Sequence, residues 1–208
     1  MGEIIKRLEN VDNVIYDANI IVYYCFLYNN HRIEEYTTKA RKLTEFLINN
    51  GSIIVVPKFI VDEIKRKSIL NIVKEYVFPP KNIIGLDKNP SYALFYRLNQ
   101  KVNENFLNLL KKDYFIVENY EPNEEDFILI KSFFMEFDDV EKMNNFLKLK
   151  NRSNPLPSNE DLKLILFSKY KNAPLISNDY DITFFVDDLL ESNLAYDIFE
   201  FKSISYYN

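Results

Sequence analysis

Short apolar runs that alternate with helical patterns constrain the fold of this chain more than any other feature. The first run, Val14-Ile15-Tyr16, ends at Asp17, and residues 19–27 after it are apolar on nearly every face. The second run, 52–56, closes at a proline and is followed by a helical pattern over 58–70. A strand, a helix, a second strand and a second helix in succession predict a parallel sheet with right-handed crossover connections.

The remainder of the chain changes pattern and then returns to it. An amphipathic helix is expected over 33–49, ending at Asn49-Asn50-Gly51. Residues from about 71 to 154 are typical of a helical insertion or cap, with long helical stretches over 91–112 and 123–150 and one alternative strand at Phe115-Ile116-Val117. A helix over 159–171, a strand at Leu175-Ile176-Ser177 and a last strand over 198–201 follow. We therefore expect one α/β domain over 1–208, with three α/β/α layers around a mostly parallel sheet and a helical insertion at about 71–154.

Composition excludes several classes of site. The chain has three glycines and neither a GxGxxG nor a GxxxxGK[ST] sequence, so Rossmann and P-loop nucleotide binding are not expected. A single cysteine, Cys25, and a single histidine, His31, exclude four-cysteine zinc sites and HExxH sites. No apolar run has the length of a membrane span, and the first residues lack a signal-peptide pattern. A soluble cytoplasmic protein that does not bind membranes is the expectation.

Acidic residues follow or flank the predicted strands. They are Asp17, Glu63, Asp161 and the pair Asp179 and Asp181. Because ligand sites of open parallel sheets lie at the carboxyl ends of the strands, these acids are expected to meet in a metal site. Each also has a local alternative. Asp17 and Asp161 could cap helices, Glu63 could pair with Lys67 on an exposed helix face, and Asp179 and Asp181 could stabilise a turn.

Three blocks of sequence resemble the PIN-domain nuclease family. They are VIYDAN at 14–19, VPKFIVDEI at 56–64 and SNEDLKLILFSKYKNAPLISNDYDITFF at 158–185. The last is the most specific, because it joins a helix-opening acid to an apolar helix and a strand that ends in Ser-x-Asp-x-Asp. Together the blocks cover under half of the chain. The stretch at 71–154 is longer than compact members of that family need, which leaves the substrate open rather than the fold.

The resemblance implies a metal-dependent nuclease, an endoribonuclease that hydrolyses RNA phosphodiester bonds with Mg²⁺ or Mn²⁺. It implies Asp17, Glu63, Asp161 and Asp179 as catalytic metal ligands, Asp181 as a fifth acid, and Asn19 and Ser177 as hydrogen-bonding neighbours. Hard divalent cations prefer such oxygen ligands. The RNA backbone needs positive charge outside the acids, for which the candidates are Lys65, Arg66, Lys67, Lys148, Lys150 and Arg152. The alternative for short basic runs is a solvated face.

Two other functions compete with this one. A PIN-like scaffold could bind RNA or a protein without cutting. A phosphatase of the haloacid-dehalogenase type also opens with a strand-end aspartate, but it needs a second aspartate two residues on, where this chain has Asn19. The net charge of −5 counts against a nucleic-acid substrate, although an acidic catalytic cluster would account for part of it. The sequence leaves open RNA against DNA, homodimer formation and control by an inhibitor protein.

Overall fold

Five parallel strands form a single sheet at the centre of the protein. The computed structural model describes residues 3–26, 34–66 and 92–205. The strand order is β3-β2-β1-β4-β5, and every neighbouring pair is parallel. The strands are β1 (Asn13–Tyr16), β2 (Ile53–Pro57), β3 (Phe115–Glu118), β4 (Leu175–Ser177) and β5 (Ile198–Glu200). The central strand is β1, in which Ile15 is paired with Val55 on one side and Leu175 on the other.

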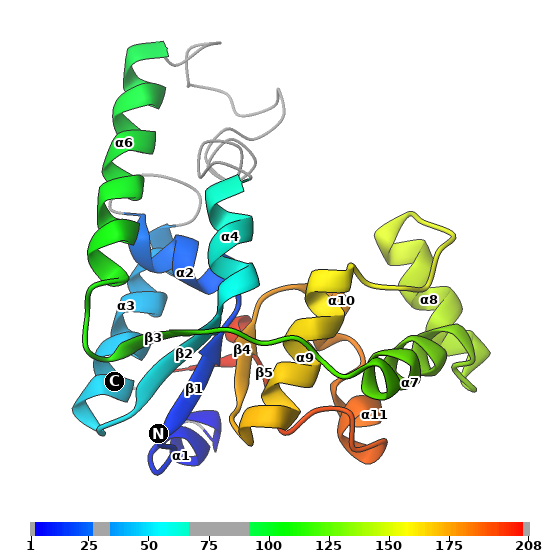
Figure 1. The fold of residues 1–208 in the computed structure, drawn as a ribbon. Coiled ribbons are helices and arrows are strands. Elements are labelled where there is room, and N and C mark those ends of the chain that lie inside the picture. Colours follow the sequence, from blue (N-terminus) through cyan, green and yellow to red (C-terminus); the bar gives the residue numbers. More distant parts are fainter. Residues whose placement is uncertain (1–2, 27–33, 67–91, 206–208) are drawn as a thin grey trace.

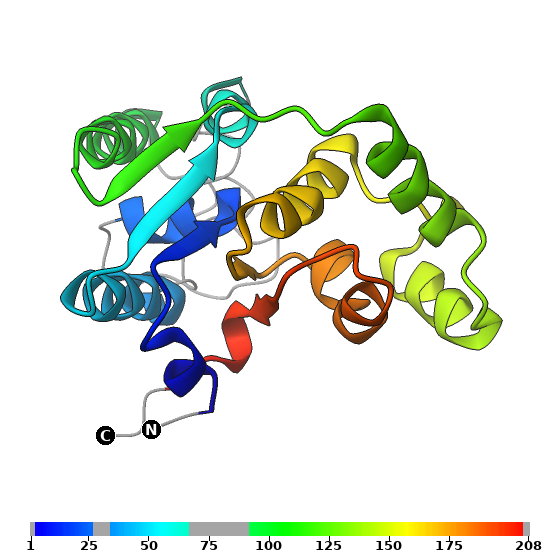
Figure 2. The same ribbon diagram turned by 60° about the horizontal axis from the view of Figure 1, so that its bottom comes forward.

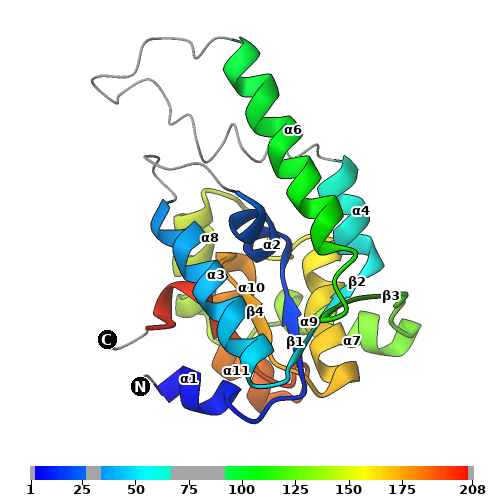
Figure 3. The ribbon, with the colours of Figure 1, turned by 90° about the vertical axis from the view of Figure 1, so that its left-hand side faces the viewer.

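Helices cover both faces of this sheet. They are α1 (Glu3–Leu8), α2 (Ala18–Cys25), α3 (Glu34–Asn49), α4 (Lys58–Arg66), α6 (Tyr92–Leu109), α7 (Glu124–Met135), α8 (Val140–Lys150), α9 (Asn159–Lys171), α10 (Tyr180–Thr183) and α11 (Val186–Glu191), with a 3-10 turn, η1 (Phe201–Ser203). Figure 3 shows α2, α3 and α6 in front of the strands and α9 behind them. The predicted α/β class and three-layer arrangement are confirmed. None of the helices in the described ranges combines the length and the apolar character needed to cross a bilayer.

The central strands owe their position to being apolar on both faces. Val14, Ile15, Val55 and Ile176 are all buried, as expected for parallel strands covered by helices on each side. The helices beside them begin and end at recognisable signals. The helix α9 opens with a capping box at Ser158 and closes at a residue in the left-handed region, where asparagine is well tolerated.

The segment predicted as a helical insertion also supplies a strand of the sheet. Its β3 pairs in parallel with β2, so the alternative strand at 115–117 is confirmed and the segment is not purely helical. The predicted helical stretch over 123–150 is wrong at its centre, because α7 ends at Met135 and α8 begins at Val140. The new helix starts there because the Asp139 side chain accepts the N–H of Lys142. Residues 71–91 of the predicted insertion lie outside the described residues.

The helices α7 and α8 lie beside the sheet rather than on it. Figures 1 and 2 show both helices on the far side of α9, α10 and α11 from the strands. An aromatic cluster joins them to the rest of the domain: Phe146 of α8 contacts the rings of Tyr180, Phe184 and Phe185, and Phe134 of α7 contacts Phe185 edge-on. The end of α8 is therefore fixed against α10.

Candidate metal centre

The carboxyl ends of the central strand β1 and its neighbour β4 carry two of the predicted acids. Asp17 directly follows β1, and its backbone N–H donates to the carbonyl of Ile176 at 3.1 Å, so it is held against the end of β4. Asp179 lies two residues after β4, where it caps α10. Asp161 reaches the same edge from the first turn of α9, and Asp181 from the first turn of α10. Four of the five predicted acids thus come from elements that converge on one edge.

Three of these acids have the geometry of a cation site. One carboxylate oxygen from each of Asp161, Asp179 and Asp181 lies within 4.8 Å of the other two. Oxygen ligands stand about 2.0–2.1 Å from Mg²⁺ in an octahedral site, so ligands on opposite sides are roughly 4 Å apart. Adjacent ligands of such an ion are roughly 3 Å apart, so small side-chain rotations that draw the three oxygens to separations of about 3–4 Å would suit one ion. A set of carboxylate oxygens without nitrogen or sulfur ligands also fits a hard divalent cation.

Asp17 is buried beside this group and is fully hydrogen-bonded. Its Oδ1 accepts the N–H of Ala18, and its Oδ2 accepts the side chains of Asn19 and Ser177, each at 2.6 Å. Burial raises the pKa of Asp17 to about 7; the hydrogen bond from Ser177 opposes the rise, and the charges of Asp161 and Asp179 add to it. Asp17 therefore lies beside the group of Asp161, Asp179 and Asp181 without being a member of it, and the predicted neighbours Asn19 and Ser177 lie against it.

Asp161 and Asp179 serve as helix caps and as members of the acid group at once. The Asp161 carboxylate accepts the N–H of Ser158 at 3.1 Å, which completes the capping box of α9. Burial raises its pKa to about 6, against the hydrogen bond from Ser158 and with the charges of Asp179 and Asp181. Asp179 Oδ1 accepts the N–H of Asp181 at 2.8 Å, and its own N–H donates to Ser177 Oγ at 2.9 Å. Capping and site formation are compatible because each cap leaves a carboxylate oxygen facing the group.

Two cationic side chains from the end of α8 contact the acids. Lys150 Nζ lies 2.9 Å from Asp181 Oδ1 and 3.5 Å from Asp179 Oδ1, and Arg152 Nη1 lies 3.0 Å from Asp181 Oδ2. Burial lowers the pKa of Lys150, but the Asp181 and Asp179 carboxylates outweigh it and raise that pKa above its ordinary value. Among the described residues, Asp181 Oδ1 accepts no hydrogen bond of good geometry, although it is buried. The acid group therefore holds cationic partners supplied by the chain itself.

The remaining predicted residues lie elsewhere or cannot be placed. Glu63 is partly buried on α4, and the group of Asp161, Asp179 and Asp181, found within the described ranges, does not include it. Arg66 of α4 pairs with Glu160 of α9 at 3.6 Å, so this basic residue is close to the first turn of α9. Lys65 and Lys148 are exposed, and Lys67 lies outside the described residues. The predicted basic residues that the structure describes are thus divided between α4, the exposed side of α8 and the acid group.

Comparisons of this chain with protein-family models, curated proteins and solved structures found no match. The PIN-like character of the chain therefore stays a prediction from its motifs. The structure adds the spacing, burial and partners of the acidic side chains.

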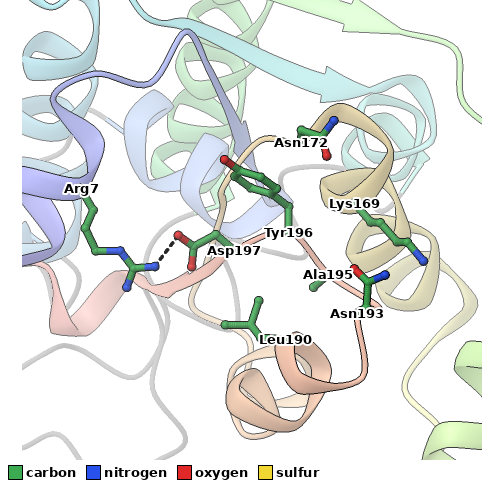
Figure 4. Close-up of a pocket in the computed structure, with 8 residues that line it drawn as sticks. All are labelled: Arg7, Lys169, Asn172, Leu190, Asn193, Ala195, Tyr196 and Asp197. Atoms are coloured by element: carbon green, nitrogen blue, oxygen red, sulfur yellow. Dashed lines mark hydrogen bonds and ion pairs between the residues drawn. The ribbon is translucent and has the colours of Figure 1, made fainter.

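A separate hollow lies at the opposite edge of the sheet, where the strands begin. It has a volume of about 400 Å³ and is lined by Arg7, Lys169, Asn172, Leu190, Asn193, Ala195, Tyr196 and Asp197. Figure 4 shows the ion pair between Arg7 and Asp197, whose atoms are 2.6 Å apart, at one side of the hollow. Because that pair already balances one of its charges and none of the clustered acids lines it, this hollow is not the candidate metal centre.

Proposed function

We propose that this protein is a metal-dependent nuclease, an endoribonuclease that hydrolyses phosphodiester bonds of RNA with Mg²⁺ or Mn²⁺. The observation that carries the proposal is the group of Asp161, Asp179 and Asp181, whose carboxylate oxygens lie within 4.8 Å of one another. It lies where parallel sheets bind their ligands. When bound there, a divalent cation would lower the pKa of a coordinated water and offset negative charge on the phosphate.

Each residue of the site would have a separate task. Asp161, Asp179 and Asp181 would hold the cation through one oxygen each. Asp17 would position Asp179, because Ser177 Oγ donates to Asp17 at 2.6 Å and accepts the N–H of Asp179 at 2.9 Å. Lys65 and Arg66, on the exposed side of α4, would contact RNA phosphates. Arg66 is near the site because it pairs with Glu160, the residue before Asp161.

A catalytically inactive RNA- or protein-binding scaffold is the second candidate. Lys150 and Arg152 favour it, because they already neutralise Asp179 and Asp181 with distances of 2.9–3.5 Å. In such a scaffold the two pairs would be structural, and neither metal binding nor cleavage would occur. The two candidates therefore make opposite predictions about divalent cations.

Cleavage of a mixed single-stranded RNA pool tests the proposal. Wild type would be compared with Asp179→Asn and Asp17→Asn in Mn²⁺, Mg²⁺ or EDTA, and Asp187→Asn on the exposed side of α11 would be the matched control. We expect cleavage in the metal buffers, retention in the control, and loss to the EDTA background in both site variants. RNA binding that does not need metal, with no cleavage by wild type, would instead support the scaffold.

A further inference from the structure

The end of α8 delivers two cations to the acids from one short segment. Lys150 is the last residue of the helix, and Arg152 follows the cap residue Asn151, which has a left-handed backbone. Cationic side chains are favoured at this end of a helix by its dipole. Both side chains reach Asp181, from which they are 2.9 and 3.0 Å away. The segment thus occupies the place where the proposed cation would bind.

Arg152 is held in place by contacts besides the acid. Its Nη2 donates to the carbonyl of Pro155 at 3.4 Å, and its guanidinium carbon lies 4.9 Å from the ring centre of Phe146. Phe146 is itself fully buried. Three different groups therefore fix one guanidinium, which is the planar, preorganised cation suited to such a role. Arg152 is a positioning residue that orients Asp181.

Lys150 differs from Arg152 in what holds it. Within the described part of the chain, its ammonium group contacts Asp179 and Asp181, and its side chain is 27% exposed. A lysine side chain has a flexible stem and a strongly hydrated head, so it can turn into solvent without disturbing the backbone. The Lys150 side chain can therefore turn into solvent when another cation takes its place beside the two carboxylates.

The same oxygen atoms would serve the ammonium group and a divalent cation. Lys150 Nζ lies 2.9 Å from Asp181 Oδ1, a buried oxygen that the ammonium leaves without a well-formed hydrogen bond. A divalent cation placed among Asp161, Asp179 and Asp181 would stand within a few ångströms of that ammonium. Like charges at such a separation repel strongly where solvent is partly excluded. Both cannot occupy the group together.

We propose that Lys150 is an internal counter-cation that holds the acid group in the metal-free protein and is displaced when a divalent cation binds, while Arg152 remains on Asp181. The inference rests on the proposed function, because it requires that the acids bind a metal ion. It makes metal binding and the position of the α8 terminus mutually dependent. The metal-free protein keeps its acids neutralised, and the metal-bound protein exposes one additional positive charge beside its site.

Lysine reactivity measures the displacement directly in the unmodified protein. Wild type would be treated briefly with an amine-acetylating reagent, with Mn²⁺ or with EDTA, and each lysine quantified by mass spectrometry. We expect Lys150 to be protected in EDTA and acetylated several-fold faster in Mn²⁺. Lys148, exposed two residues earlier on the same helix, should not respond and is the internal control. If Mn²⁺ binds and the Lys150 rate is unchanged, the displacement is refuted.

Calorimetric titration with Mn²⁺ tests the competition. Lys150→Gln removes the competing charge and is expected to bind Mn²⁺ about tenfold more tightly than wild type. Lys148→Gln makes the same charge change away from the acids and should stay within about twofold. Without metal, Lys150→Gln should melt at a lower temperature than Lys148→Gln, and saturating Mn²⁺ should remove that difference.

The outcomes separate this inference from the proposed function. Equal Mn²⁺ affinities for wild type, Lys150→Gln and Lys148→Gln would overturn the displacement and leave the nuclease proposal standing. An absence of binding in all three would overturn both. Binding by Lys150→Gln with none by wild type would overturn the displacement, because Lys150 would then block the site, and would favour the inactive scaffold for the wild-type protein.

Discussion

The replacement of Asp17 by asparagine should remove most of the pH dependence of stability that the metal-free protein shows above about pH 5. Asp17 is only 6% exposed, and its pKa is raised from 3.8 to about 7 by burial before any other cause. The folded protein therefore keeps a proton that the unfolded chain has already lost, and rising pH favours unfolding. This stability is fully present below about pH 4 and is lost as the pH passes 7. Linkage between these two pKa values gives a loss of about 3 kcal/mol from pH 5 to pH 8.

The asparagine variant keeps part of the local hydrogen bonding and loses another part. Its carbonyl oxygen can still accept the N–H of Ala18, but its NH₂ group would face donors on Asn19 and Ser177. That conflict costs about 1–3 kcal/mol and does not depend on pH. Because wild type loses about 3 kcal/mol over this range and the variant does not, Asp17→Asn should gain about 3 kcal/mol relative to wild type between pH 5 and pH 8, and should be the more stable of the two at pH 8.

Urea unfolding in EDTA at the two pH values measures this difference. Asp187→Asn, which changes an exposed acid on α11, is the matched control and should follow wild type. A loss of stability between pH 5 and pH 8 as large in Asp17→Asn as in wild type would refute this prediction. That result would mean that Asp17 is ionised throughout and that its burial does not perturb it.

Three further predictions concern the same region. Ser177→Ala removes a hydrogen bond that lowers the pKa of Asp17, so urea titrations should show that the fall in stability extends to higher pH, with a cost of about 1–3 kcal/mol; an unchanged pH profile would contradict this. Phe146→Ala should cost about 3–5 kcal/mol, whereas Leu149→Ala, 66% exposed on the same helix, should cost under about 0.5; equal losses would mean that α8 is not anchored through Phe146. Mn²⁺ binding near pH 6 should release protons, because the pKa values of Asp17 and Asp161 are raised to about 7 and about 6. The calorimetric heat of Mn²⁺ binding should therefore depend on the ionisation enthalpy of the buffer at pH 6 and not at pH 8.

The central strands could be predicted because a strand that is buried on both faces is an uninterrupted apolar run in the sequence. Residues 14–16, 53–56 and 175–176 are apolar without interruption, and they lie in β1, β2 and β4. The sequence pattern of the edge strand β3 is weaker, since Ile116 and Val117 are each 39% exposed and β3 is paired on one side only. The short helices α10 and α11 span 4 and 6 residues, which is too few for a helical period to emerge.

The site could be predicted only in the part that the strands determine. Asp17 and Asp179 come at the ends of β1 and β4, so the sheet itself brings them to one edge. Lys150 and Arg152 are 29 to 31 residues from the acids that they contact, and these contacts depend on how Phe146 packs against α10, which no local pattern reveals. Glu63 illustrates the converse. Helical periodicity predicted correctly that Glu63 is less exposed than Asp62. Periodicity gives the direction of a side chain around the helix axis, however, and does not tell whether that side chain reaches the acid group.

A crystal of the wild-type protein soaked in Mn²⁺ and measured at the manganese absorption edge tests the central claim most directly. We expect one anomalous peak about 2.1 Å from an oxygen of each of Asp161, Asp179 and Asp181, with the Lys150 ammonium moved away from Asp181. An empty acid group at saturating Mn²⁺, with Lys150 still 2.9 Å from Asp181, would contradict the proposal that these acids form a metal centre.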